Sequence, residues 1–559
     1  MKYDADAAPD GPAREGVPVP LTPAQHWFFA QDPVDPQRYN QGVALRLRAP
    51  VTFREVQEIL DQVAAAHDAF GLRFHRSAAG QWRQVATLDL HVPLEASDLS
   101  GLTAGQQESG LAELADWLHG SLDLTAGPVG CAALADLGAG HDPLLLVIAH
   151  HLIIDAVSWR ILVDDIEAAW GALRAGQPPP LKGGMPFQAW AATLAAQAGG
   201  WDEEVGYWTA RVPVSDPWAQ QWTQGISGAS ASAGLREPRR HRLTLEATAT
   251  RRLLAATGGT AASIDHVLLA TVASTVRAAL GITPVLIDVE THGREGVGAD
   301  VSRTVGWLTA TWPVSIEVGE LSTVALAAQV AEATRGLPRG GVGYGALRWV
   351  TPRAAVRSLP QAHVLFTYLG RYQTRSAPGR RVEWVLGLEG GSNTAFRSCP
   401  YVLIANAWIQ DDELMIDWIW LDGAPGTEGL AEAAETVIPT LRDAAEAIPS
   451  HPASRPGLSG TEPATATEGI ILSAWQEVLD TAAPWNDPVD GGAREIGVED
   501  DFFDAGGDSI HMIQVVSRLR RAFGVRVPLR IMREHPTARS LASEIDAMVA
   551  AADNTAQSS

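Results

Sequence analysis

Two short apolar runs, each followed at once by ionisable residues, limit most strongly what this chain can fold into. The runs are 144–148 and 284–289. Neither has a helical period, and each ends in a polar segment, so both are predicted to be buried strands. After the first run the chain turns and continues with helical spacing through Ile161, Leu162 and Ile166. A buried strand leading through a polar turn into a helix indicates an α/β fold.

The first polar turn holds four side chains that could carry chemistry: His150, His151, Asp155 and Ser158. Turns held by a rigid scaffold are common places for reactive groups. A structural interpretation fits this stretch equally well when it is taken alone. In that interpretation Asp155 or Ser158 caps the helix, and the histidines are polar groups satisfied in the core.

Composition excludes several classes of protein. A chain of 559 residues is too long to fold around one hydrophobic core, so its length predicts two to four domains. Two cysteines, Cys131 and Cys399, cannot build a disulfide framework, no Cys/His cluster has zinc spacing, and a reducing cytoplasm fits. The N-terminus lacks the apolar core of a signal peptide. No apolar run approaches the roughly 20 residues that a membrane-spanning helix needs. A net charge of −23 argues against nucleic acid.

Pattern and composition predict the domain boundaries. An α/β region is expected to consist of an N-lobe and a C-lobe, followed by a linker rich in Pro, Ser, Ala, Thr and Gly and by a small helical domain. The predicted segments are a disordered N-terminus at 1–16, the α/β region at 17–450 (N-lobe about 17–185, C-lobe about 186–450), the linker at 451–466, the helical domain at 467–551 and a tail at 552–559.

Local signals predict individual elements. Thr22 and Pro23 read as the N-cap and first turn of a helix. Residues 401–410 and 414–421 read as a hairpin, and 264–280 as a long apolar helix. In the last domain, helices are expected around 470–479, 509–523 and 537–550.

The last domain resembles a peptidyl carrier protein of nonribosomal peptide synthetases. The likeness lies in residues 501–510, where Gly506, Gly507 and Asp508 precede Ser509. The resemblance implies an all-α four-helix carrier bundle with 4′-phosphopantetheine attached to Ser509 by a phosphopantetheinyl transferase. A serine at a helix N-terminus suits a phosphate. An aspartate before this serine is frequent in carriers that partner epimerization domains.

Residues 17–450 resemble the condensation-domain superfamily, and within it the epimerization branch. The resemblance implies a two-lobed, chloramphenicol-acetyltransferase-like α/β fold. Three positions depart from the family pattern: Ala156 and Thr291 stand where glycine is usual, and Thr367 stands for an asparagine. Seven motifs carry the likeness, in the family's order, at 21–28, 150–162, 265–270, 290–295, 303–313, 338–345 and 366–370.

Inverting the α-carbon of an acyl thioester needs one group that removes the proton and another that returns one on the opposite face. His151 and Glu290 end predicted strands of different lobes, so they could face each other across a channel. The resemblance assigns such roles to these two positions, with no metal and no pyridoxal phosphate. Ser158, Tyr344 and the Thr367 position are candidate donors to the developing enolate oxygen.

The remaining polar residues of the turn are expected to be structural. Asp155 should pair with an arginine, and the sequence leaves Arg294 and Arg73 open as partners. His150 is expected to orient the loop, and Trp307 to belong to the core.

Three functions remain open. The motifs favour epimerization of a carrier-bound aminoacyl or peptidyl thioester. The alternative is a condensation-type acyltransferase forming an amide or ester, and a non-catalytic docking domain is the third. The carrier follows the epimerization-like domain, whereas it usually precedes it. Other synthetase modules for adenylation, condensation and release are expected in trans or on a longer chain.

Overall fold

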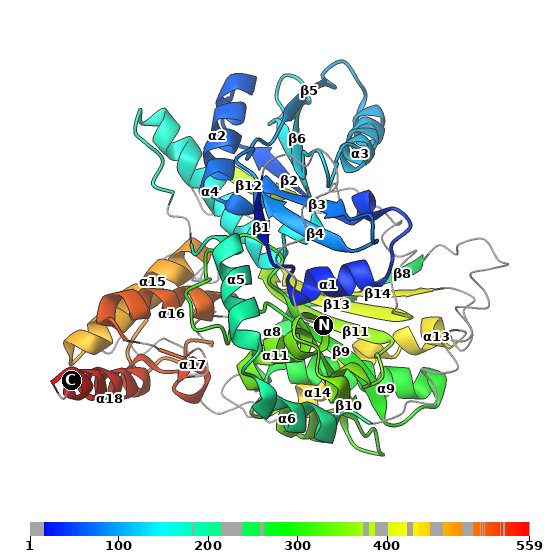
Figure 1. Cartoon of the computed structure of the whole chain (residues 1–559), viewed down its shortest axis with the longest axis vertical. Helices are drawn as coiled ribbons and strands as arrows, with labels where there is room; N and C mark the ends of the chain where they lie inside the picture. The colour runs from blue at the N-terminus through cyan, green and yellow to red at the C-terminus, as the bar shows by residue number, and fades with distance from the viewer. Residues whose placement is uncertain are drawn as a thin grey trace.

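The structure is a computed structural model that describes residues 16–181, 184–213, 238–257, 262–372, 380–385, 401–421, 427, 429–447, 462–482, 496–503, 505, 507, 509–525, 527–528 and 531–557. The N-terminal segment predicted to be disordered lies, apart from Gly16, outside these residues, as does most of the predicted linker. Two α/β lobes lie one above the other, and a helical domain lies beside the lower lobe (Figure 1).

The N-lobe is built on a five-stranded sheet of order β12-β2-β7-β6-β5, with a three-stranded sheet β1-β4-β3 beside it. Alternate residues of β7 face opposite sides: Leu146 and Ile148 pack with the α3 residues, and Leu145 and Val147 with the main core. The elements are β1 Val17–Val19, β2 Asn40–Leu47, α2 Phe53–Ala65, β3 Leu72–Arg76, β4 Trp82–Ala86, β5 Leu94–Asp98, α3 Ala104–Gly120, β6 Gly130–Asp136, β7 Leu144–His150 and α4 Ala156–Arg174.

The C-lobe is built on a six-stranded mixed sheet of order β10-β9-β11-β13-β14-β8. Its β13–β14 pair confirms the predicted hairpin, and α9 confirms the predicted long helix. The elements are α5 Phe187–Ala198, α6 Val205–Arg211, β8 Pro238–Leu245, α8 Ala247–Thr257, α9 Ile264–Leu280, β9 Val285–Thr291, β10 Ala310–Ile316, α10 Thr323–Thr334, α11 Val342–Gly345, α12 Ala354–Arg357, β11 Val364–Tyr372, β13 Leu403–Gln410, β14 Glu413–Leu421, α13 Leu430–Ala434 and α14 Val437–Ala447.

Two segments cross between the lobes, which a single boundary near residue 185 does not capture. Strand β12, Val382–Val385, leaves the C-lobe and pairs antiparallel with β2. Glu383 on β12 accepts a hydrogen bond from Arg48 at 2.8 Å. In the other direction, helix α1, Pro23–Ala30, carries Trp27 onto Tyr401 of the C-lobe, with ring centroids 6.0 Å apart. Thr22 caps α1 as predicted.

The C-terminal domain has a core of its own around Trp475, Phe502 and Leu541. Its last helix continues to Gln557, beyond the end at residue 550 that the sequence predicted, and so runs into the segment 552–559 predicted as a tail. No helix in the described ranges has the length and apolar character needed to cross a membrane. The helices are α15 Ala466–Ala482, α16 Ser509–Phe523, α17 Ile531–Glu534 and α18 Ala538–Gln557.

Candidate active site at the junction of the lobes

His150 fixes the turn that follows β7. Its ring is buried, with Nε2 2.6 Å from the carbonyl of Pro36, while Nδ1 accepts the backbone N–H of Leu152 at 3.1 Å. Burial lowers the pKa of His150 to about 3, so the ring is neutral and donates from Nε2. These two bonds hold the His150 ring against the backbone on both sides of the turn.

The hydrogen bonds around His151 define which of its ring nitrogens is basic. Nδ1 lies 2.8 Å from the carbonyl oxygen of Ile154, an acceptor, so Nδ1 carries the proton of the neutral ring. Nε2 lies 2.9 Å from the side-chain nitrogen of Gln41. Trp159 donates to Gln41 Oε1 at 3.0 Å, which turns the Gln41 amide N–H toward Nε2. The Nε2 lone pair of His151 therefore accepts the Gln41 N–H, and Nε2 is the basic nitrogen of the ring.

Aromatic rings and a carboxylate surround His151. Tyr39 stacks on its ring at 4.9 Å, and Trp307 lies 4.3 Å away between centroids. Burial lowers the pKa of His151, and the nearby Glu290 carboxylate opposes that change. Trp307, expected in the core, both contacts His151 and lines the pocket that contains Glu290.

Glu290 lies near the end of β9, between Thr311 on β10 and Thr367 on β11 in strand register. The Thr367 hydroxyl donates to Glu290 Oε2 at 3.3 Å. Threonine at this position, where the family has asparagine, therefore still supplies a hydrogen-bond donor to the carboxylate. The other departure on this strand, Thr291, donates to the carbonyls of Ala310 and Gly340 and does not line the pocket.

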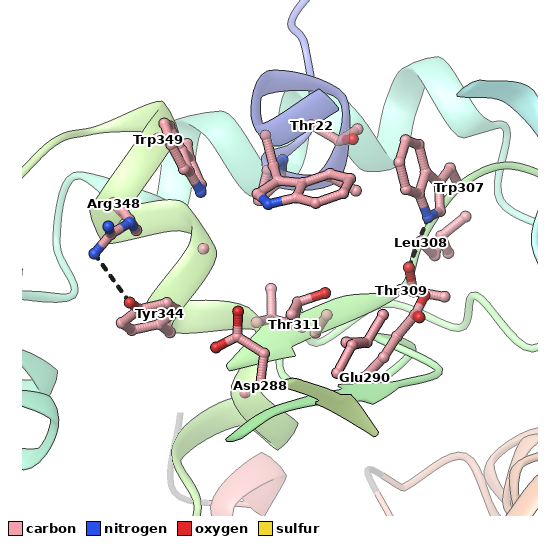
Figure 2. A pocket seen from close by; sticks show the side chains of 18 of the residues that line it. Thr22, Asp288, Glu290, Trp307, Leu308, Thr309, Thr311, Tyr344, Arg348 and Trp349 are labelled. Carbon is pink, nitrogen blue, oxygen red and sulfur yellow. Dashed lines mark hydrogen bonds between the residues drawn. The ribbon is translucent and has the colours of Figure 1, made fainter. Parts of the chain in front are cut away.

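One pocket at the junction contains Glu290 and is walled largely by aromatic side chains from both lobes (Figure 2). Thr309 lines it next to Glu290, and its hydroxyl accepts the Trp307 indole N–H at 2.7 Å. Among the described residues Thr309 donates no hydrogen bond, so its proton is available to a ligand. Tyr344 lies at the opposite end from Glu290, beside Asp288 and Arg348.

Asp155 and Arg294 join the two halves of the site. The Arg294 guanidinium donates to both oxygens of Asp155, at 2.9 and 3.0 Å, and both side chains are buried. This settles the partner of Asp155, because Arg73 pairs with Asp89 instead. Gly293, at φ +64°, allows the preceding turn to lie directly on Leu308, where a Cβ would meet the carbonyl oxygen at 1.6 Å.

Ser158 belongs to this buried cluster and not to the pocket. Its hydroxyl is within hydrogen-bond distance of Asp155 Oδ1 at 2.7 Å and of the Gly306 carbonyl, and it accepts the Gly306 N–H. The geometry therefore gives no support to Ser158 as an enolate donor. Ala156 begins α4 directly after Asp155 and does not line the pocket either.

The fold recurs in known proteins. The model of the Condensation domain family matches residues 17–452. This chain belongs to the condensation-domain family. The match confirms the family that the seven motifs indicated.

Relatives of this condensation domain are synthetase proteins far longer than the chain. It is 31% identical to a chondramide synthase of Chondromyces crocatus over 72% of the chain and 10% of that protein. It is 32% identical to surfactin synthase subunit 2 of Bacillus subtilis (strain 168) over 67% of the chain and 10% of that protein. The chain thus spans a small part of each.

Solved structures show the same condensation fold. The epimerization domain from the third module of tyrocidine synthetase B aligns over 78% of this chain and 99% of its own, with 24% identity and a TM-score of 0.63. The first condensation domain of the calcium-dependent antibiotic synthetase aligns over 78% and 98%, with 19% identity and a TM-score of 0.56. Both support the two-lobed fold.

The C-terminal domain matches a phosphopantetheine attachment site over residues 470–545 and so holds covalently attached 4′-phosphopantetheine. The structure fits this group, since α16 begins at Ser509, where helix N–H groups favour a phosphate. Gly507 lets the preceding turn lie on Phe502, whose ring a Cβ would meet at 2.3 Å. The described residues contain no cluster of three or more side chains suited to a metal ion.

Proposed function

We propose that the condensation-family domain epimerizes the α-carbon of an aminoacyl or peptidyl thioester carried on 4′-phosphopantetheine. One observation carries the proposal: Glu290, near the end of β9 in the C-lobe, lies close enough to His151, which follows β7 in the N-lobe, for the carboxylate to influence the pKa of the imidazole. Glu290 lines the pocket, and His151 contacts Tyr39 and Trp307, which line it as well. The pair would supply the two proton-transfer groups that inversion requires.

The proton balance of the reaction involves only these two groups. The acyl group would be held as a thioester of the pantetheine arm, and the thioester carbonyl would make the α-hydrogen acidic. A neutral His151 accepts a proton at Nε2 once Gln41 has released that nitrogen, or an ionised Glu290 accepts it at a carboxylate oxygen. The other group in its protonated form returns one to the opposite face. Which of the two is the base depends on the starting configuration. The product has the mass of the substrate.

Charge that develops on the thioester carbonyl oxygen needs a hydrogen-bond donor. Ser158 is committed to the Asp155 cluster, and Thr367 is engaged with Glu290. Thr309 lies on the pocket wall with its proton available, so we assign it this role in preference to Ser158 and Tyr344. Aromatic side chains on the pocket wall lower the local polarity, which would strengthen such a bond.

The carrier domain would present the substrate from Ser509, which we propose as the attachment residue. A phosphopantetheinyl transferase would install the group, and other synthetase modules would load and release the acyl chain. The synthetase relatives support these partners, since their lengths leave room for such modules.

The alternative function is condensation, in which the domain joins a carrier-bound acyl group to an amine or alcohol. It is kept because a solved condensation domain covers the same share of the chain as the epimerization domain. Condensation would use His151 and needs no carboxylate at position 290.

The test loads Ser509 of the holo protein with defined aminoacyl groups in D₂O and follows configuration and mass together. Epimerization predicts racemised product with one deuterium at the α-carbon and no added acceptor. Glu290→Gln should lose inversion, whereas Glu295→Gln, a matched change on the following loop, should keep it. A product enlarged by an acceptor, or full inversion in Glu290→Gln, contradicts the proposal.

A further inference from the structure

Strand β9 directs a second carboxyl group into the pocket that contains Glu290. Asp288 lies two residues before Glu290, so both side chains project from the same face of the strand, about 7 Å apart along it. Both line the pocket. Figure 2 shows Asp288 on the pocket floor, between Tyr344 and Thr311, with Glu290 nearer to Thr309. The pocket therefore extends from the proposed proton-transfer end to a second polar end.

Asp288 is a buried group with unused hydrogen-bonding capacity. It is 7% exposed, and the Tyr401 hydroxyl donates to its Oδ2 at 2.8 Å. That bond is the one the carboxyl group makes with the described residues. A buried carboxyl group with an unfilled acceptor, facing a pocket, is suited to receive a donor from a ligand. Burial raises the pKa of Asp288 to about 7, against the opposing effects of Tyr401 and Arg348.

The walls at this end are aromatic. Trp27 stacks on Tyr401, with ring planes 22° apart, and Trp349 and Tyr344 line the same pocket. Such surfaces favour a flat, apolar ligand group that packs in offset or edge contact. A ligand here therefore combines an aromatic body with a polar tip that meets Asp288.

The charges at this end argue for an uncharged tip. The Arg348 guanidinium acts on Asp288 electrostatically and is held by the Tyr344 hydroxyl at 3.0 Å and by two backbone carbonyls. A cationic ligand group would be repelled by Arg348, and an anionic one by Asp288. A neutral donor avoids both penalties.

We propose that the Asp288 end of the pocket binds the side chain of the acyl group, and that Asp288 accepts a hydrogen bond from a phenol or indole. The substrate would then be a tyrosyl or tryptophanyl thioester, or a peptidyl thioester ending in one of these residues. This inference rests on the proposed function, because it places the α-carbon between Glu290 and His151.

Binding tests the subsite without needing the reaction. Non-hydrolysable pantetheine amides of tyrosine, phenylalanine, leucine and lysine are titrated against the full-length protein. The tyrosyl amide should bind about 10- to 100-fold more tightly than the phenylalanyl amide, since a buried acceptor is otherwise left unpaired. The lysyl and leucyl amides should bind more weakly than both.

Two variants separate Asp288 from its neighbour. Tyr401→Phe removes the internal donor but keeps the carboxyl group, so it should retain the preference for tyrosine over phenylalanine. The double variant Asp288→Leu with Tyr401→Phe leaves no orphaned donor and should bind the two amides within about twofold of each other. A preference that survives in the double variant overturns the role of Asp288.

The outcomes distinguish the subsite from the proposed function. Leucyl or lysyl amides that bind as tightly as tyrosyl overturn the subsite, whatever the reaction. If the tyrosine preference holds in binding but no loaded thioester exchanges its α-hydrogen, the subsite is supported and epimerization is not. Exchange that is fastest with tyrosyl or tryptophanyl thioesters supports both.

Discussion

At the scale of single residues, the site is defined by which hydroxyl and carboxyl groups keep hydrogen-bonding capacity after the fold has formed. Ser158 and Thr309 are both hydroxyl residues within the motifs of the sequence, yet their surroundings differ. Ser158 is enclosed by Asp155, Gly306 and Arg294, whereas Thr309 lines the pocket with its proton available. Their roles follow from this contrast and not from residue type.

Replacing Thr309 tests the proposed donor to the developing oxyanion. Thr309→Val keeps the shape and removes the hydroxyl, so the rate of α-hydrogen exchange should fall by about 100-fold with little change in substrate affinity. Thr309→Ser keeps the donor and should stay within a few-fold of the parent. Equal rates in the two variants, measured by single-turnover exchange, would exclude the role.

Asp288 should make stability depend on pH. Its folded pKa is about 7, above the unfolded value near 3.8, so the native state binds the extra proton and stability falls as pH rises through this range. Asp288→Asn has no carboxyl group that titrates at this position, so the variant does not lose stability in this way as the pH rises. The free energy of unfolding of the variant relative to the parent should therefore rise by roughly 2–3 kcal/mol between pH 5 and pH 8. Urea unfolding at both pH values measures it; a constant difference would contradict the burial of this carboxyl group.

At the scale of elements, the start of α4 and the end of β9 are joined by the buried Asp155–Arg294 pair. Asp155 also caps α4 by accepting the Ser158 N–H and receives the Leu308 N–H. The pair thus holds the His151 turn and the Glu290 strand in one geometry, although neither residue lines the pocket.

Breaking the Asp155–Arg294 ion pair should lower the free energy of unfolding of the domain, because the pair supports the site without lining the pocket. Arg294→Gln leaves the Asp155 carboxylate buried without its cation and should destabilise the domain by about 3–5 kcal/mol. Adding Asp155→Asn removes the orphaned charge, so the double variant should lose less than the sum of the single changes. Denaturant unfolding of all four proteins checks the expectation, and simple additivity would contradict a direct ion pair.

The sequence predicted the elements whose signals are local. The cap at Thr22, the buried strands 144–148 and 284–289, and the hairpin 401–421 follow from short-range patterns, and the structure contains each. The crossing of β12 could not be predicted, because four residues pair with a strand more than 300 positions away. Gln41 and Asp288 were also missed, since inside a strand pattern neither differs from an ordinary polar residue.

At the scale of the whole molecule, the carrier domain touches the C-lobe through α16, the helix that begins at Ser509. Ser517 on α16 donates to Asp300 at 2.6 Å. Burial would raise the pKa of Asp300, but hydrogen bonds from Ser517 and Ser302 and the nearby Arg520 hold it below its usual value. The contact lies on the loop between β9 and β10, which also contains Arg294.

Reversing the charge at this contact tests whether the condensation-family domain acts on the acyl group carried by the carrier domain of the same chain. Asp300→Arg should slow α-hydrogen exchange of the acyl group loaded on Ser509 by about 10-fold. The reason is that the new guanidinium would lie near Arg520, and the two positive charges repel each other. Exchange of a soluble pantetheine thioester should be unchanged. Ser302→Ala, which removes only the bond inside the loop, is the control. If exchange slows equally for both substrates, Asp300 stabilises the fold and has no role in the contact with the carrier domain.

The most direct measurement of the central claim follows α-deuterium loss from each enantiomer of a loaded, α-deuterated aminoacyl group. Two proton-transfer groups on opposite faces predict that Glu290→Gln blocks loss from one enantiomer and His151→Gln from the other, and that neither variant inverts the centre. Inversion that persists in either variant, or a product enlarged by an acceptor, would contradict the account.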